Sequence, residues 1–152
     1  MIKEKFSIGA GSDARLIRQE VFVEEQGYSR EFDEHDASSW SLVLYLDGYP
    51  ISTGRLRKID PETYQIERLA VRKPFRGQKV GSYTVKYLCN KAIALGGRHC
   101  LLHAQADKLG FYRSLGFKAV DGEIDIEEGQ PHLYMEKSLL RPQRKKRPKP
   151  IF

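Results

Sequence analysis

The chain has 152 residues, of which 40% are hydrophobic, and its 26 Lys and Arg residues outnumber its 20 Asp and Glu residues. This length and apolar content suit one globular domain with a complete core, and they exclude a fibrous or wholly disordered chain. Two cysteines without Cys-x-x-Cys spacing and no apolar run of about 18 residues argue against a disulfide scaffold and a membrane span, so we expect a cytoplasmic protein with free thiols.

The positive charge is concentrated at one end of the sequence. Residues 141–152 contain six basic residues, three prolines and no acid, whereas residues 1–140 contain 20 basic and 20 acidic residues. Proline and charge without apolar periodicity are typical of an extended, solvated segment. The sequence therefore predicts a single domain over 1–140 and a basic, proline-rich tail over 141–152, and nucleic acid could bind only through the tail.

The first predicted elements are a strand and a helix. Residues 2–8 (IKEKFSI) have the pattern of a strand. Ser12 or Asp13 is expected to cap a helix, because apolar residues recur after them at helical spacing, and Gly27 is expected to end it.

A meander of strands is expected next. Residues 41–57 predict two strands joined by an Asp-Gly-Tyr-Pro turn at 47–50, and residues 63–71 (TYQIERLAV) predict a third strand.

The second half predicts a crossover helix followed by strands and a short helix. Apolar residues keep one face of a helix over 79–95, and Gly96-Gly97 end it. Strands are expected at 99–106 and 131–139, with a short helix at 106–116 between them. The order of these elements predicts an α/β (α+β) fold, with a mixed, mostly antiparallel sheet flanked by helices.

An acidic segment follows the first predicted helix. Residues 20–36 contain seven acids and one basic residue, with aromatic residues between them. Its carboxylates could orient the ammonium group of a substrate, and a solvated helix end is the alternative. The candidates for substrate binding are Glu20, Glu31, Asp33 and Asp36.

A glycine-containing loop connects the third meander strand to the crossover helix. In the hexapeptide 76–81 (RGQKVG), backbone N–H groups and the helix start could bind phosphate oxygens. The loop has neither the G-x-G-x-x-G spacing of a dinucleotide site nor the Gly-Lys-Ser/Thr of a Walker loop. A glycine-rich turn with a basic helix start is the alternative interpretation.

Two segments extend this interpretation. IERLAVRKPFRGQKVG (66–81) and GFYRSLGF (110–117) resemble the two signature regions of the GNAT superfamily of N-acetyltransferases. IRQEVFVEEQG (17–27) and PHLYM (131–135), with the acids between 31 and 36, are similar to the ElaA-like branch of that superfamily. The resemblance covers about residues 12–138, and it implies a GNAT-like sheet and acetyl-CoA-dependent transfer of an acetyl group directly to a primary amine.

The resemblance also implies which residues bind acetyl-CoA. The pyrophosphate would lie on Arg76, Gly77, Gln78, Lys79, Val80 and Gly81. The pantetheine arm would pair with the backbone of Leu69, Ala70 and Val71, with Gln105 facing it. Two positions depart from the family pattern, because Lys79 stands where many members have glycine and Gln105 where many have asparagine.

Tyr112 is the first catalytic candidate. A phenol with an ordinary pKa of about 10 can protonate a departing thiolate, and a packing role near Phe117 is the alternative. Glu67 is the candidate general base, because strand alternation places it on the face of Leu69 and Val71; an ion-paired strand glutamate is the alternative.

Histidines compete with Glu67 for the role of base. His103 and His132 each stand alone in a strand pattern, where a hydrogen-bonded core histidine is common, and His132 is also a candidate for substrate binding. No His, Cys or Asp cluster has the spacing of metal ligands, so no metal is expected.

The partner is expected to be a small-molecule or peptide amine, and a homodimer is compatible with the sequence. The alternative function is a non-catalytic acyl-CoA-binding or nucleic-acid-binding module of the same fold.

Overall fold

The computed structural model describes residues 1–28, 32–120 and 124–139 of the chain. In chain order the elements are β1 (Ile2–Ile8), α1 (Ser12–Arg18), η1 (Gln19–Glu25), η2 (Asp36–Ser38), β2 (Trp40–Leu46), β3 (Tyr49–Asp60), β4 (Thr63–Val71), η3 (Lys73–Phe75), α2 (Val80–Ala94), β5 (His99–Gln105), η4 (Ala106–Lys108), α3 (Leu109–Ser114), β6 (Lys118–Ala119), β7 (Asp125–Glu127) and β8 (Gln130–Ser138). Within these ranges, every helix is too short or too polar to cross a bilayer.

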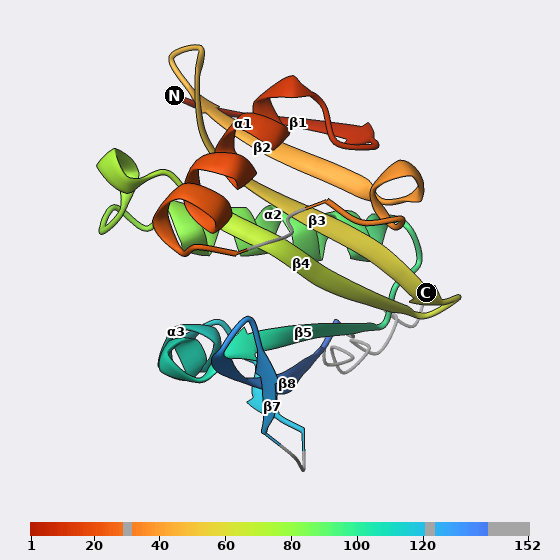
Figure 1. Ribbon diagram of the computed structural model, residues 1–152. Helices are drawn as coiled ribbons and strands as arrows, with labels where there is room; N and C mark the ends of the chain where they lie inside the picture. The colour runs from red at the N-terminus through yellow and green to blue at the C-terminus, as the bar shows by residue number, and fades with distance from the viewer. Residues whose placement is uncertain (29–31, 121–123, 140–152) are drawn as a thin grey trace, which may run out of the picture.

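The strands form one sheet with helices on both faces. Its order is β1-β2-β3-β4-β5-β8-β6, with β7 beside β8, and every neighbouring pair is antiparallel except β4 and β5. Figure 1 shows α1 in front of β2 to β4 and α2 behind them. The predicted mixed, mostly antiparallel sheet flanked by helices is therefore confirmed.

Each face of the sheet has its own core, because successive strand side chains point to opposite faces. On the α2 face, Leu88 and Val85 pack with Ile66 and Leu102 in the larger core. On the α1 face, a smaller core joins α1 and η1 to residues such as Ala70.

The strands β4 and β5 part after a short parallel ladder. Their pairing runs from Thr63 opposite His99 to Ile66 opposite Leu102. Beyond that point, among the described residues, the β5-facing edge of β4 pairs with no strand. The sheet is therefore open between its two halves at this level.

A bulge in β4 lies where the strands part. Arg55 pairs with Glu67 and Thr53 pairs with Ala70, so two residues of β4, Arg68 and Leu69, lie opposite Gly54. Arg68 has φ 52°, in the left-handed region. A Cβ at Gly54 would lie 2.6 Å from Leu88 Cδ1, so glycine is needed where α2 approaches the sheet.

This bulge corrects the predicted direction of Glu67. Strand alternation had placed Glu67 on the face of Leu69 and Val71, but the extra residue reverses the alternation. Leu69 and Val71 pack on the α2 face. Glu67 instead shares the α1 face with its cross-strand partner Arg55.

The predicted first strand and the predicted end of the first helix are confirmed, but the predicted cap of that helix is wrong. The first strand matches residues 2–8, and Gly27, with φ 74°, follows the helical segment of α1 and η1. Neither Ser12 nor Asp13 caps α1, because Gly11 is the N-cap and no side chain caps the helix. The Asp13 carboxylate instead accepts a hydrogen bond from Tyr45 Oη at 2.6 Å.

The turn of the meander is shorter than predicted. Asp47 and Gly48, both with positive φ, form it alone, and Tyr49 already begins β3. The short strands β6 and β7 were not predicted, because two or three residues are too few to show a period. The predicted tail at 141–152 lies outside the described residues.

Candidate active-site cleft

A cleft of about 910 Å³ opens where β4 and β5 part. Its walls belong to opposite faces of the sheet. One wall, which we call the α2-face half, is formed by Leu69, Val71, Phe75, Gly81, Phe111 and Tyr112. The other wall, which we call the α1-face half, is formed by Arg57, Glu67, His103, Gln105, His132 and Tyr134.

The β5 and β8 residues of the α1-face half share a face because of their register. Leu102 is buried in the core on the α2 face, so its neighbour His103 points to the other face. Tyr134 is the cross-strand partner of His103, and His132 is the partner of Gln105. These four side chains therefore project together.

The start of α2 presents backbone N–H groups to the cleft. No side chain caps this helix, and its N-cap, Lys79, has φ 64° and ψ 13°. This left-handed conformation is the one for which glycine is favoured, and a lysine adopts it at a cost of about 1 kcal/mol. Gly77 also has a positive φ, 79°. The N–H groups and the helix dipole make this end attractive to an anion.

Arg76 lies beside this helix start and is ion-paired. Its Nε donates to the backbone oxygen of Val71 at 2.9 Å, and its Nη1 lies 2.9 Å from Glu25 Oε2. The predicted loop residues Arg76, Gly77, Lys79, Val80 and Gly81 all line the cleft. Gln78 is not among the lining residues.

The open edge of β4 runs along the α2-face half. Leu69, Ala70 and Val71 line the cleft, and Ala70 and Val71 pair with β3 on the other edge. The geometry thus leaves this edge accessible to an extended ligand, which is the condition for adding a strand-like partner.

Tyr112 lies on α3 in apolar surroundings. Its ring packs edge-on against Phe111 and Phe117, with centroid distances of 5.0 Å and 6.1 Å. Desolvation by burial raises the pKa of Tyr112 to about 12. Within the part of the chain that the structure describes, no group hydrogen-bonds its hydroxyl. The phenol is therefore protonated at neutral pH and has a proton to donate.

The Glu67 carboxylate is hydrogen-bonded to two arginines and a glutamine. Its Oε1 accepts from Arg55 Nη2 at 2.9 Å and from Arg57 Nε at 2.8 Å, and its Oε2 accepts from Gln65 at 3.2 Å. Burial alone would raise the pKa of Glu67, but the hydrogen bonds and charges of Arg57 and Arg55 outweigh it and lower the pKa. Of the two interpretations of Glu67, a general base or an ion-paired strand glutamate, these contacts fit the second.

The acids Asp33 and Asp36 belong to the same network. Asp36 accepts from the buried Arg18 at 2.8 Å and from Arg55 at 3.1 Å. Burial opposes ionisation, but the hydrogen bonds of Arg18 and of the Asp33 backbone lower the pKa of Asp36 to about 2. Asp33 accepts from Arg55 at 2.6 Å and from Arg68 at 3.1 Å. Neither is a solvated helix end.

Glu20 lies apart from this network. It is part of η1, and its carboxylate accepts from Arg72 Nε at 2.9 Å. Glu31 lies outside the described residues.

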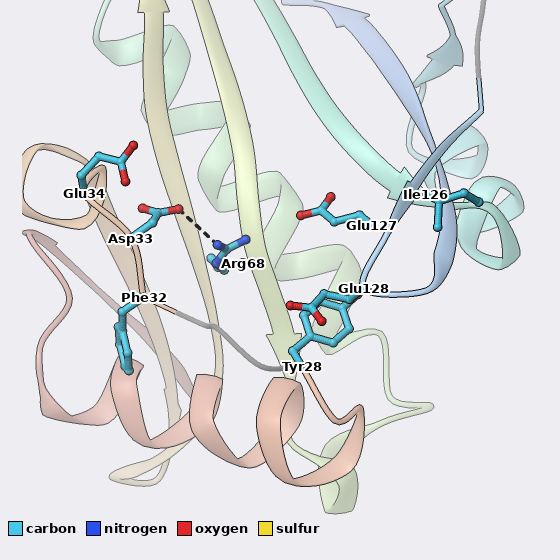
Figure 2. Close-up of a pocket in the computed structure, with 8 residues that line it drawn as sticks. All are labelled: Tyr28, Phe32, Asp33, Glu34, Arg68, Ile126, Glu127 and Glu128. Carbon is cyan, nitrogen blue, oxygen red and sulfur yellow. Dashed lines mark hydrogen bonds and ion pairs between the residues drawn. The ribbon is translucent and has the colours of Figure 1, made fainter.

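A second pocket, of about 520 Å³, adjoins the cleft and shares Tyr28, Arg68 and Glu127 with it. Figure 2 shows Arg68 between two groups of acids, with Asp33 and Glu34 on one side and Glu127 and Glu128 on the other. The pocket is lined by Tyr28, Phe32, Asp33, Glu34, Arg68, Ile126, Glu127 and Glu128. The pocket therefore has four carboxylates against one guanidinium, which favours a cationic ligand.

His103 contacts two carboxylates of β7. Its Nδ1 lies 3.0 Å from Glu127 Oε2 and its Nε2 lies 3.2 Å from Asp125 Oδ2. The ring stacks on Tyr134 with a centroid distance of 4.4 Å. His132 is buried beside it, with its Nδ1 2.8 Å from the backbone oxygen of Gln130.

Gln105 bridges the cleft at its far end. Its amide nitrogen donates to Tyr28 Oη at 2.9 Å and to Gln26 Oε1 at 3.2 Å. Burial raises the pKa of Tyr28, and the hydrogen bond from Gln105 partly offsets this effect. The side chain of Gln105 thus joins β5 to the segment after η1.

Several residues of the site could not be predicted from the sequence. Asp125, Glu127 and Tyr28 reach the site only through long-range packing, and Arg57 looked like any polar strand residue. Within residues 1–28, 32–120 and 124–139, no cluster of three or more His, Cys, Asp or Glu residues could hold a metal ion.

Comparisons with known proteins agree with this geometry. The model of the acetyltransferase (GNAT) family matches residues 12–117. The N-acetyltransferase YjcF of Bacillus subtilis is 34% identical over 127 residues, covering 82% of this chain and 90% of that protein. A crystal structure from Lactobacillus plantarum, assigned as an N-acetyltransferase, has a TM-score of 0.84 at 32% identity and covers 91% of this chain and 99% of that one.

The structural likeness extends to ElaA and beyond. ElaA of Escherichia coli has a TM-score of 0.80 at 26% identity, with 90% of this chain and 99% of that chain covered. A GNAT family acetyltransferase from Elizabethkingia anophelis, solved with acetyl-CoA bound, has a TM-score of 0.72 at 17% identity, with 90% and 97% covered, and so shares the fold. These matches confirm the resemblance that the two sequence segments indicated.

Proposed function

The chain belongs to the acetyltransferase (GNAT) family, and we propose that it transfers the acetyl group of acetyl-CoA directly to a primary amine. The observation that carries the proposal is the α2-face half, where an open strand edge, an uncapped helix start and a buried phenol lie along one wall. No cysteine is among the described residues that line the cleft, which favours direct transfer over a thioester on the enzyme.

The α2-face half fits the chemistry of acetyl-CoA. When bound, acetyl-CoA supplies the activated acetyl group. The N–H groups at the start of α2, with Gly77 and Gly81, would bind its pyrophosphate. Arg76 would do so in exchange for Glu25. The free edge of Leu69, Ala70 and Val71 would hydrogen-bond the pantetheine arm as an added strand.

Tyr112 would act as the general acid. Its phenol is protonated at neutral pH and lies on the same wall as the β4 edge. A positioned donor of this kind can protonate a leaving thiolate. The ring packs against Phe111 and Phe117, and the phenol can serve as the local proton source.

The acids of the α1-face half would favour a cationic acceptor. Glu67 is bound to Arg57 and Asp33 is bound to Arg68, so we propose that these two acids hold the arginines in place beside the acceptor. Glu34 and Glu127 line the adjoining pocket and would attract an ammonium group.

A thiol-release screen tests the function. Acetyl-CoA is supplied with a panel of monoamines, polyamines, aminoglycosides and amino-terminal peptides, and free CoA is measured against time. We expect amine-dependent release, with acetylated amine confirmed by mass spectrometry. CoA binding without any release would support the alternative of a non-catalytic acyl-CoA-binding module.

The compartment and the partner are further proposals. Cys89 and Cys100 are free and buried, which suits a reducing compartment, and we place the protein in the cytoplasm. A small-molecule or peptide amine is the proposed partner.

A further inference from the structure

The proposed transfer requires a group that removes a proton from the amine, because an ammonium nitrogen has no lone pair to attack with. Three titratable groups that line the cleft are poorly suited. Two arginines lower the pKa of Glu67. His132 is buried, and its Nδ1 faces a backbone oxygen. Burial raises the pKa of Tyr28. Of the other lining groups, His103 has an imidazole in contact with side-chain carboxylates.

His103 lies at the mouth of the strand opening. Leu102 is the last residue of β5 that pairs with β4, opposite Ile66, so His103 stands at the level of Glu67 where the strands part. Its side chain is 18% exposed and lines the cleft. Tyr134 holds the ring plane by stacking. The imidazole is therefore oriented and reachable from the cleft.

Each of its two nitrogens faces a carboxylate of β7. Glu127 Oε2 lies 3.0 Å from Nδ1, and Asp125 Oδ2 lies 3.2 Å from Nε2. Only the doubly protonated ring can donate to both carboxylates at once. A neutral ring that keeps Nδ1–H on Glu127 has a lone pair on Nε2, and the half-exposed Asp125 side chain can then turn away from it.

We propose that His103, oriented by Glu127, is the general base that takes the proton from the acceptor amine. An ammonium group replaces His103 as the partner of Asp125. One N–H bond of the ammonium breaks, the proton forms Nε2–H, and the electron pair stays on nitrogen as the lone pair that attacks the acetyl carbonyl. His103 later releases that proton to solvent, and Tyr112 protonates the departing sulfur. The second proton lost by the amine restores the phenol.

This assignment separates acid from base across the sheet. His103 lies in the α1-face half and Tyr112 in the α2-face half, so the amine would enter from one face and the thiol would leave toward the other. The proposal rests on the proposed function. The charged and titratable groups around His103 are Asp125 and Glu127 from β7, His132 and Tyr134 from β8, and Glu67 and Arg57 across the cleft.

The test is the pH profile of kcat/KM for a reactive amine from the screen. His103→Gln should lower kcat/KM by about 10²-fold and remove the acid limb, because no imidazole is left to deprotonate. Glu127→Gln should keep a limb but move it to lower pH, because a neutral partner stabilises the imidazolium less. His99→Gln is the matched control, since His99 is exposed at the other end of β5 and its profile should equal that of the wild type.

The outcomes separate this inference from the proposed function. Wild-type release of CoA with a His103→Gln profile that keeps its acid limb, at unchanged acetyl-CoA affinity, overturns the role of His103 and leaves the function standing. An acid limb unmoved in Glu127→Gln also overturns the dyad, even if His103→Gln fails to fold. A wild-type protein that acetylates no amine overturns the proposed function itself.

Discussion

The two halves of the cleft are built in different ways. The α2-face half uses backbone groups, namely a strand edge and a helix start, with one buried phenol among apolar side chains. The α1-face half uses polar side chains of β3, β4, β5 and β8; Arg57 and Glu67 form an ion pair, and His103 contacts Glu127 of β7. A backbone site depends little on which side chains are present. A site of paired charges depends on each of its side chains.

This difference bears on how freely the residues of each half can vary. At the start of α2 the backbone conformation matters most, and Lys79 adopts the left-handed conformation without being glycine. The α1-face half has less freedom, because Glu67 is bound to a guanidinium and His103 contacts a carboxylate. We therefore expect changes there to alter the choice of acceptor, and changes in the α2-face half to alter the reaction itself.

The largest expected effect is on Tyr112. In Tyr112→Phe the ring packing against Phe111 and Phe117 remains and the proton donor is lost. We expect kcat to fall by about 10²-fold or more, with little change in acetyl-CoA affinity. On the same variant, assays at saturating acetyl-CoA measure kcat, calorimetric titration measures acetyl-CoA affinity, and thermal melting measures stability. Normal turnover would leave water as the proton source and make Tyr112 a wall of the site.

The second effect is the acid lability of the ion network. The folded pKa of Asp36 is about 2, below its ordinary 3.8, so its ionised form adds stability that is complete above about pH 5 and is lost as pH falls toward 2. A shift of this size is worth about 2 kcal/mol, and the lowered pKa values of Asp33 and Glu67 act in the same direction.

Urea unfolding at pH 7, 5 and 3 measures this loss. Glu34→Gln is the control, because the Glu34 side chain is 84% exposed and its variant should follow the wild-type curve. A free energy of unfolding that does not change between pH 7 and pH 3 would contradict a stabilising role for the network.

The third effect concerns the ion pair of Arg76 with Glu25, which joins the loop before α2 to η1. Arg76→Ala should weaken acetyl-CoA binding about tenfold, because one charge-assisted hydrogen bond to the pyrophosphate is lost. Glu25→Gln should tighten it by a smaller factor, because Arg76 no longer has to leave a carboxylate. Opposite signs by calorimetry sharpen the comparison, and equal losses would mean that the ion pair itself shapes the loop.

The smallest effect is expected from the tail. Deletion of residues 141–152 removes six basic residues and no acid, so retention on heparin should fall while acetyl transfer to small amines stays unchanged. Loss of turnover in a folded truncated protein would place the tail in the active site.

Much of the fold could be predicted because its signals are local. Alternation marked the first strand, glycines marked the ends of α2 and the helix before Gly27, and the two family segments marked the α2-face half. Prediction failed where one residue mattered: the bulge at Arg68 reversed the strand and moved Glu67 to the other face. No local pattern announces such a bulge, which lies opposite Gly54, where Leu88 of α2 approaches the sheet.

The sequence by itself determined the sheet class, the family and the loop that faces the open edge of β4, because each depends on residues near one another in the chain. The tertiary structure alone decided the α1-face half. Asp33, Glu67, Glu127 and His103 come from segments 24 to 94 positions apart, and they meet only when the sheet closes around β4 and β5. The residue type decides whether a side chain can carry a charge, but its pKa and its function depend on neighbours that folding supplies.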